Sequence, residues 1–309
     1  MPTRPIRVAV VGVGHVGALH AQVYARLPGV QLVAVCDVNR PRAEAVAQPL
    51  RCAALRDVRE LSGMVDAASI AVPTSLHAAI GTLLLQAGIH VLIEKPITST
   101  LAQADGLLAL ARRKRLTLQV GHIERFNAAI QSAQRYLTHP RFLEVHRLSP
   151  YPFRGTDVSV VLDVMIHDLD LVLALVGAAP RRVDAVGIPV LSKTEDIANA
   201  RLVFPTGCVA NLTASRVSDD TMRRIRVFQE DCYLSIDYQH QTVNFARKAG
   251  RRIHRTAFPV KRRPPLDDEL AAFVHTVATG RRPLVSGEEA RRALALALKI
   301  EQVMRRGKQ

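Results

Sequence analysis

Residues 7–37, RVAVVGVGHVGALHAQVYARLPGVQLVAVCD, decide the fold. An apolar, β-branched run stops at Gly12, and Gly12, Gly14 and Gly17 make a G-x-G-x-x-G pattern. A helical pattern over 15–27 follows, and then a second apolar run over 31–36 ends at Asp37. Strand, glycine turn, helix, strand and terminal acid within about thirty residues predict the first βαβ unit of a dinucleotide-binding sheet.

Each glycine has its own use in such a turn. Gly12 permits the tight turn, Gly14 lets the backbone approach a pyrophosphate, and Gly17 lets helix and strand pack closely. The helix starts with His15 and Val16, so its free N–H groups and positive dipole end are available to the phosphates. We assign these five residues to the cofactor site.

Asp37 indicates which dinucleotide is bound. A carboxylate at this strand end accepts hydrogen bonds from the ribose hydroxyls and repels a 2′-phosphate, which favours NAD over NADP. Arg40 lies close enough in sequence to leave NADP open. The other interpretation of Asp37 is a turn residue at a strand end.

Strands and helices continue to alternate after Asp37. Strands are predicted at 68–72, 90–93 and 117–120, with helices at 77–87 and 101–113, where Thr100 and Gln103 can form a capping box. This succession predicts an α/β fold with a parallel, doubly wound sheet. Because ligands of such sheets bind at the carboxyl ends of the strands, the loops at Pro73, Lys95 and Gly121 should line one rim.

Lys95 stands directly after an apolar strand, between Glu94 and Pro96. A lysine fixed there would place its ammonium near the nicotinamide, where it could stabilise an alkoxide as hydride leaves. The alternative is a solvated surface lysine at the start of a loop.

A second chemical feature is the apolar stretch VSVVLDVMIHDLDLVLALV at 158–176. On a helix, His167 lies about 40° and Asp170 about 20° from Asp163, whereas Asp168 lies about 140° away. Burying these groups without partners would cost several kcal/mol, so the stripe should face a cleft or a polar network. An imidazole beside a carboxylate suits general acid and base chemistry, and a structural Asp–His pair is the alternative.

The second half of the chain reads as antiparallel hairpins followed by helices. Short alternating runs predict strands at 144–148, 183–187, 200–204, 209–215, 224–229 and 233–237. A helix is expected over 160–175, and two more over 266–279 and 288–305. We expect 251–265 to be the most mobile part.

Composition narrows the class of protein. With 309 residues, 48% of them hydrophobic, the chain can hold two domains with sizeable cores. We expect no membrane span, because no apolar run is long enough, and no leader, because the start lacks that pattern. The four cysteines are scattered along the chain, which fits reduced thiols in a cytoplasm. The net charge is +15, but the basic residues are not interleaved with aromatic ones, so we expect no nucleic-acid partner. An anionic small substrate or an anionic membrane surface would also explain a positive protein surface.

These features together resemble the Gfo/Idh/MocA family of oxidoreductases. The matching motifs are GVGHVG at 12–17, VPTSLH at 72–77, EKP at 94–96, GHIERFN at 121–127, DVMIH at 163–167 and the closing segment 283–302. The resemblance implies an N-terminal Rossmann domain over 1–121 and a C-terminal α/β domain over 122–309. The second domain would have a largely antiparallel open sheet that forms a homodimer or homotetramer.

The resemblance also implies roles for individual residues. Lys95 matches the catalytic lysine, Asp163 an acid that orients the site, and His167 the group that exchanges a proton with the substrate hydroxyl. Either His167 or Lys95 can be the base. Residues matched to the cofactor side are Pro73, Thr74, His77, Glu94 and Arg125, with Pro96 often preceded by a cis peptide; no metal is implied.

Within the family, residues 124–130, 154–173 and 213–228 resemble the branch that oxidises UDP-N-acetylglucosamine at C3 before amine transfer in lipid A precursor synthesis. Arg125, Arg154 and Arg216 are the candidates for the substrate diphosphate, with surface arginines as the alternative. Lys95, Asp163 and His167 complete the expected substrate site. Three other functions stay open: an inositol or polyol dehydrogenase, an NAD-sensing regulator without catalysis, and an NAD-dependent glycosidase.

Overall fold

The computed structural model describes residues 4–151 and 158–307 and separates into two compact units. The first unit contains Met1–His122 and Leu266–Arg291, and the second contains Ile123–Pro265 and Arg292–Gln309. The main boundary lies one residue from the expected one. The expected domains were each continuous in sequence, whereas Leu266–Arg291 belongs to the first unit.

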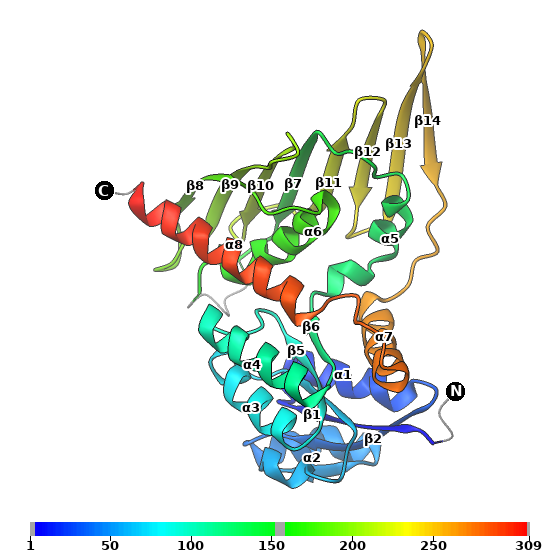
Figure 1. Ribbon diagram of the computed structural model, residues 1–309, viewed down its shortest axis with the longest axis vertical. Helices are drawn as coiled ribbons and strands as arrows, with labels where there is room; N and C mark the ends of the chain where they lie inside the picture. The colour runs from blue at the N-terminus through cyan, green and yellow to red at the C-terminus, as the bar shows by residue number, and fades with distance from the viewer. Residues whose placement is uncertain (1–3, 152–157, 308–309) are drawn as a thin grey trace. The chain divides into compact units, whose positions relative to one another are not determined.

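The first unit is built on a six-stranded parallel sheet with the order β3-β2-β1-β4-β5-β6, so the expected doubly wound sheet is confirmed. Its strands are β1 (Ile6–Val11), β2 (Val30–Cys36), β3 (Ala53–Leu55), β4 (Ala67–Ile70), β5 (His90–Glu94) and β6 (Leu118–Gly121). Its helices are α1 (His15–Arg26), α2 (Arg40–Leu50), α3 (Thr74–Gln86) and α4 (Leu101–Lys114), with a short 3-10 turn η1 (Val58–Leu61) (Figure 1).

Local sequence signals fix several of these boundaries. The Thr100–Gln103 capping box at the start of α4 is confirmed, because each side chain accepts from the other residue's backbone N–H. Asn39 caps α2 in the same way, by accepting from the backbone N–H of Arg42. The Lys95–Pro96 peptide is cis. These signals set the loops that follow β2 and β5.

Helix α7 (Pro265–Thr279) belongs to the first unit because its apolar side packs there. Leu270 and Phe273 are fully buried in the same cluster as Val8 and Val10 of β1. Around this core, Arg26 of α1 contacts Asp267 at 2.7 Å. Sequence position alone assigned α7 to the second domain, and this long-range packing overrides it.

The second unit holds an eight-stranded sheet with the order β14-β13-β12-β11-β7-β10-β9-β8. Only β7 and β10 pair in parallel, so the expected largely antiparallel sheet is confirmed. The strands are β7 (Phe142–Leu148), β8 (Arg182–Ile188), β9 (Ile197–Val203), β10 (Val209–Ser215), β11 (Met222–Phe228), β12 (Cys232–Asp237), β13 (Thr242–Ala249) and β14 (Arg252–Phe258).

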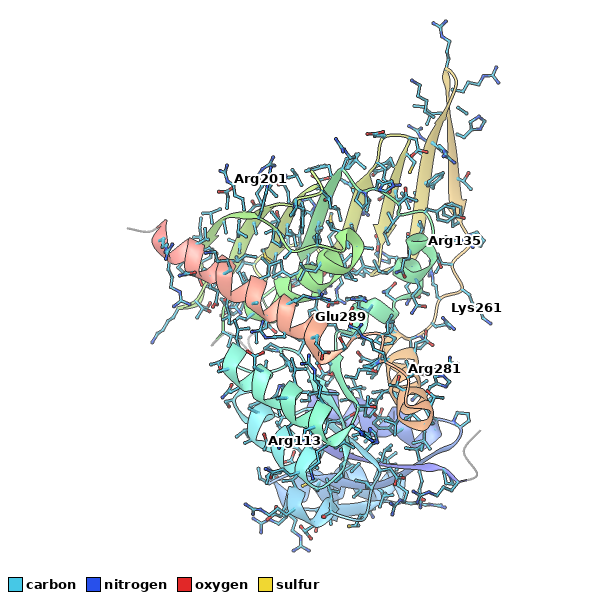
Figure 2. All side chains as sticks on the ribbon, in the orientation of Figure 1. Arg113, Arg135, Arg201, Lys261, Arg281 and Glu289 are labelled. Carbon is cyan, nitrogen blue, oxygen red and sulfur yellow. The ribbon has the colours of Figure 1, made fainter. Side chains whose placement is uncertain are left out.

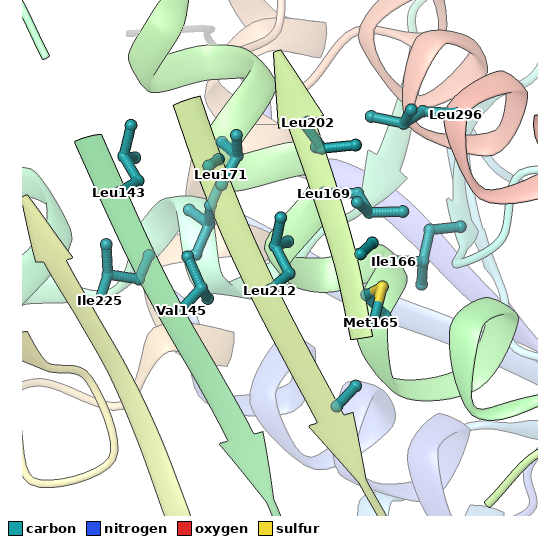
Figure 3. Close-up of a cluster of buried hydrophobic side chains, with 14 of the residues drawn as sticks. Leu143, Val145, Met165, Ile166, Leu169, Leu171, Leu202, Leu212, Ile225 and Leu296 are labelled. Atoms are coloured by element: carbon teal, nitrogen blue, oxygen red, sulfur yellow. The ribbon is translucent and has the colours of Figure 1, made fainter. Parts of the chain in front are cut away.

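Helices cover one face of this sheet (Figure 1). They are the 3-10 turn η2 (Ile123–Phe126), α5 (Ala128–Gln134), the π-helical turn η3 (Val161–Met165), α6 (Ile166–Val176) and the part of α8 (Gly287–Arg306) that follows Arg291. Figure 3 shows the core between them, where Leu143, Val145 and Leu212 of the strands meet Met165 and Leu169. Alternate strand residues point into this core, and no helix of residues 4–151 or 158–307 lies on the other face of the sheet.

The segment 251–265, expected to be the most mobile part, includes a regular strand. Arg252–Phe258 forms β14, which pairs with β13 across a turn at Gly250, where φ is +60°. The Phe258 ring stacks on Tyr136 with 4.4 Å between ring centroids and also contacts Phe245. The high density of arginine and lysine suggested a solvated loop, whereas three aromatic rings hold the hairpin to the unit.

Surface charge is carried on both units. Figure 2 shows Arg113 of α4 and Arg281 in the first unit, and Arg135 and Arg201 in the second, and all four side chains are exposed. Across residues 4–151 and 158–307, no helix combines the length and the apolar character needed to cross a membrane.

Candidate functional site

The glycine turn after β1 has the shape that a dinucleotide requires. Gly12 has φ +82°, and a Cβ there would lie 2.6 Å from Val72 Cγ1. A Cβ on Gly17 would collide with the Gly12 carbonyl oxygen. A Cβ on Gly14, in contrast, would meet no heavy atom within 4 Å, so this glycine borders open space at the start of α1. The turn therefore needs Gly12 and Gly17 for folding and leaves Gly14 free for a ligand.

The entry of α1 adds to this site. No side chain caps the helix at Gly14, and His15 and Val16 at its first turn are exposed. Backbone N–H groups at an uncapped helix start are the donors that a phosphate uses. These residues thus fit the expected pyrophosphate position.

Asp37 is held firmly at the end of β2. Its Oδ2 accepts from the Val13 N–H at 3.0 Å and its Oδ1 from the Asn39 N–H at 2.9 Å. Each carboxylate oxygen has a further lone pair with which it can accept from a ribose hydroxyl. The cation beside it is Arg42, with Nη1 3.6 Å from Oδ2, whereas Arg40 contacts Glu44 at 2.7 Å. The sequence suggested Arg40 as the cation near Asp37. Proximity in sequence did not show that the Arg42 side chain is the one that turns back towards the carboxylate.

His77 braces two loops of the same rim. Its Nδ1 lies 2.9 Å from the Pro96 carbonyl oxygen and its Nε2 lies 2.9 Å from the Val72 carbonyl oxygen. The side chain is buried, so it holds the loop after β4 to the loop after β5. Pro73 and Thr74 stand at the start of α3 within the first of these loops. This arrangement indicates that the buried His77 side chain supports the loop that is expected to bind the cofactor.

Lys95 follows β5 directly and is half-buried. Its strand lies beside β4 and β6 in the sheet, so the residues after β4, β5 and β6 share one edge. Glu94 accepts from the Lys95 backbone N–H at 3.3 Å and also contacts His20 of α1 at 3.1 Å. Burial raises the pKa of Glu94, but its interactions with His20 and Lys95 outweigh burial and lower it overall. Lys95 therefore has an ionised neighbour.

In the second unit, Asp163 and His167 lie on a helix that is not uniform. Asp163 is in the π-helical turn η3 and His167 is in the first turn of α6, and both are half-buried. A π turn holds an extra residue, so the continuous α-helix expected over 160–175 is wrong at its start. Single π turns are frequently found at functional sites. Both residues are partly exposed in the second unit.

The rest of the expected stripe is used differently. Asp170 is buried and its Oδ2 lies 3.5 Å from Arg125 Nη1. Arg125 belongs to η2, so this ion pair joins η2 to α6. Arg125 is largely enclosed, with 12% of its side chain exposed. This ion pair thus fixes the position of Arg125 relative to α6 and gives a structural role to Asp170, to which the sequence had assigned none.

Asp168 is part of a buried network that the sequence did not reveal. Arg147 of β7 contacts both Asp168 oxygens, at 3.0 and 3.1 Å, and also reaches Glu124 at 3.1 Å. Tyr238 donates its hydroxyl to Asp168 at 2.6 Å. Burial lowers the pKa of Arg147, yet the carboxylates of Asp168 and Glu124 raise it overall. The apolar context of Asp168 was the signal, since a buried carboxylate requires a partner.

Arg216 is not available for a substrate diphosphate. Its side chain is 1% exposed and contacts Asp196 at 2.9 Å. Its other nitrogens donate to the Val158 carbonyl and to the hydroxyls of Ser192 and Thr194. The guanidinium fixes the end of β10 to the segment before β9, which corrects the expected role. Arg154 lies outside the described residues.

Comparison with known proteins agrees with these features. Residues 6–122 match the family described as "Oxidoreductase family, NAD-binding Rossmann fold", and 129–235 match "GFO/IDH/MocA C-terminal domain". The chain is 42% identical over 302 residues to the UDP-N-acetylglucosamine 3-dehydrogenase of Acidithiobacillus ferrooxidans, covering 96% of each protein.

A solved structure with that enzyme name, from the same organism, has a TM-score of 0.92 at 41% identity and covers 96% of this chain and 97% of that chain. The myo-inositol 2-dehydrogenase of Thermotoga maritima is 26% identical over 313 residues, 94% of each protein. The chain therefore belongs to the Gfo/Idh/MocA family of oxidoreductases and carries the NAD-binding Rossmann domain of that family.

Proposed function

We propose that this protein is an NAD-dependent dehydrogenase that oxidises C3 of UDP-N-acetylglucosamine to a ketone. The observation that carries the proposal is the 42% identity to an enzyme of that name over 96% of both chains. The glycine turn, with its open space at Gly14, and the firmly held Asp37 support the cofactor half. The half-buried Asp163 and His167 support the proton-transfer half.

Oxidation of a secondary alcohol removes one proton and one hydride. NAD, when bound, supplies the hydride acceptor. His167 takes the proton from the C3 hydroxyl, and Asp163 orients the imidazole. Lys95 donates a hydrogen bond to the same oxygen and stabilises the negative charge that develops on it. The carbon–hydrogen and oxygen–hydrogen bonds break as the carbon–oxygen double bond forms.

Lys95 is the second candidate for the base. Lys95 stands beside the ionised Glu94, and a lysine ammonium in that position suits stabilisation of a developing negative charge. This environment supports His167 as the base. Lys95→Met should then lose turnover at every pH, while His167→Gln should lose the pH dependence that the imidazole brings.

We propose that Arg125 and Arg154 bind the substrate diphosphate. Of the two, Arg125 lies in the part of the chain that the structure describes. Its enclosed guanidinium contacts Asp170 through Nη1 at 3.5 Å, and a guanidinium has five N–H donors in all. A guanidinium can bind a phosphate group through two parallel hydrogen bonds, which makes an arginine a suitable ligand for a diphosphate.

A substrate panel tests the proposed function. Formation of NADH is followed with UDP-N-acetylglucosamine, free N-acetylglucosamine and myo-inositol at equal concentration. We expect turnover with the nucleotide sugar and little with the other two. Preference for myo-inositol would favour the alternative, an inositol dehydrogenase, for which the Thermotoga maritima relative is the specific observation. Release of free sugar without net NADH would indicate a glycosidase, and NAD binding without any reaction would indicate a regulator.

We further propose that the 3-keto product receives an amine in lipid A precursor synthesis and that the enzyme is a cytoplasmic homo-oligomer. All four cysteines are free thiols, which suits a reducing compartment. The helix-free sheet face bears Phe142, Phe228 and Tyr233 in ring contact, with centroids 5.6 and 4.9 Å apart. Such an aromatic group on an uncovered face fits an interface between copies.

A further inference from the structure

The first unit contains a cluster of three ionisable side chains, of which Glu94 was assigned to the cofactor side and His20 and Glu269 to no site. His20 of α1, Glu94 of β5 and Glu269 of α7 each place a ligand-type atom within 4.8 Å of the other two. His20 Nε2 lies 3.1 Å from Glu94 Oε1, and the His20 side chain is fully buried. The elements α1, β5 and α7, which are far apart in sequence, therefore meet at this group of side chains.

The electrostatic balance of this group keeps Glu94 ionised. Burial acts to raise the pKa of Glu94, and the interaction with His20 is the strongest of the effects that lower it. The charge of Lys95 and its backbone N–H act in the same direction. Glu269 from α7 and Tyr24 from α1 also face the group, and burial together with the Glu269 and Glu94 charges raises the pKa of Tyr24. Tyr24 is therefore neutral, and His20 is the side chain that contacts the Glu94 carboxylate, at 3.1 Å.

Glu94 is also fixed in space. A Cβ on Gly121 of β6 would lie 2.8 Å from Glu94 Oε1, so the missing side chain makes room for the carboxylate. On another side the carboxylate contacts the His20 ring, and its Oε2 accepts from the Lys95 backbone N–H. The peptide that follows is the cis Lys95–Pro96 bond, where the chain turns away from β5. Movement of the Glu94 carboxylate would thus move the backbone at Lys95.

We propose that His20 is a positioning residue for Lys95: it holds the Glu94 carboxylate against the Lys95 backbone N–H, which keeps the Lys95 side chain in place. His20 does not touch the substrate in this proposal, which rests on the role of Lys95 in the proposed function. The 3.1 Å contact joins His20 to Glu94 directly.

A double-mutant cycle tests the proposal, with His20→Leu, Glu94→Gln and the double variant assayed for kcat, KM and NAD affinity. His20→Leu should lower kcat about 10-fold to 100-fold, with NAD affinity changed less than about threefold. Because His20 acts through Glu94, the double variant should be no slower than Glu94→Gln alone. His20→Gln, whose amide can still donate to the carboxylate, should recover part of the loss. Additive losses, or full activity of His20→Leu, would overturn the proposal.

The pH profile gives a second readout that a purely structural role would not move. Without His20, Glu94 takes up a proton more readily, so the acid limb of kcat/KM should shift to higher pH in His20→Leu. Tyr24→Phe is the matched control: it lies one turn along α1, is equally buried and loses a 2.8 Å contact with Ser69. It should lower the melting temperature and leave kcat and the acid limb unchanged. An equal effect of Tyr24→Phe would show that packing alone is responsible.

Failure of the proposed function would look different. If Lys95→Met kept its turnover, the role of Lys95 itself would be wrong. If Lys95→Met lost turnover while His20→Leu and Glu94→Gln kept theirs, only the inference about His20 would fail. Should His20→Leu not fold, Glu94→Gln and His20→Gln carry the same comparison.

Discussion

At the scale of single residues, the four ionisable groups between Asp163 and Asp170 separate into two sets. Asp168 and Asp170 are buried and contact Arg147 and Arg125, whereas Asp163 and His167 are half-buried. Ion pairs offset the free-energy cost of burying the first set, whereas the second set remains partly exposed. Exposure, which a helical wheel does not give, makes this distinction.

His167 carries the first prediction. Replacing it by Gln removes the proton acceptor but keeps a polar side chain of similar size. We expect kcat to fall about 100-fold to 10,000-fold, because that is the usual contribution of a general base. NAD affinity, measured by calorimetry, should stay unchanged. Near-normal turnover would show that His167 is not the base.

Asp196 carries a prediction about stability and pH. It is fully buried beside Arg216, and although burial raises its pKa, hydrogen bonds from Ser192, Leu191 and Arg216 lower it overall. Because the folded pKa lies below the unfolded value of about 3.9, the stabilisation is complete above that pH and is lost as the pH falls through the folded pKa. Asp196→Asn should cost about 3–5 kcal/mol at neutral pH, since it leaves Arg216 buried without its carboxylate.

Urea unfolding of the Asp196→Asn variant and the native protein at pH 7 and pH 3 measures this difference. The gap between the two should be smaller at pH 3. A gap that does not change with pH would mean that the charge of Asp196 contributes nothing.

At the scale of elements, the glycine turn separates folding from binding. A side chain on Gly17 would meet the Gly12 backbone, whereas one on Gly14 would enter open space. Gly14→Ala should therefore melt at the native temperature, and its methyl group should weaken NAD binding about tenfold or more by blocking the pyrophosphate. Gly106→Ala in α4, where a Cβ also meets nothing within 4 Å, is the matched control and should bind NAD normally. Equal NAD affinity in the two variants would contradict the assignment of this turn.

Element types followed from the sequence where the signal was local. The glycine turn, the capping box at Thr100 and the alternating strands depend on neighbours within a few residues. Helix α7 was assigned to the wrong unit because its packing partners in β1 are more than 250 residues away. The β13–β14 hairpin was missed because charges dominate its composition, while Phe245 and Phe258 secure it.

The candidate site was predictable in part for the same reason. Motifs placed Lys95, Asp163 and His167 on named elements, but no motif indicated His20 or Arg147. Their partners, Glu94 and Asp168, are distant in sequence, and only the fold brings them together. Arg216 was misjudged because a buried arginine and a surface arginine look alike in a sequence.

At the scale of the whole molecule, the uncovered sheet face is the surface on which we expect copies of the chain to meet. Phe228 is 36% exposed and lies between Phe142 and Tyr233 in ring contact. Phe228→Glu should shift the mass measured by light scattering towards the monomer, because a carboxylate would be buried at the interface. Arg201, on the same face in Figure 2, can be changed to Lys as a control. An unchanged mass in Phe228→Glu would place the interface elsewhere.

The central claim is that hydride leaves C3 of a UDP-N-acetylglucosamine molecule and is accepted by NAD. UDP-N-acetylglucosamine carrying deuterium at C3 tests this directly, with mass spectrometry of the NADH that forms. We expect the NADH to gain one deuterium and the sugar product to lose it. Unlabelled NADH formed from that substrate would contradict the account.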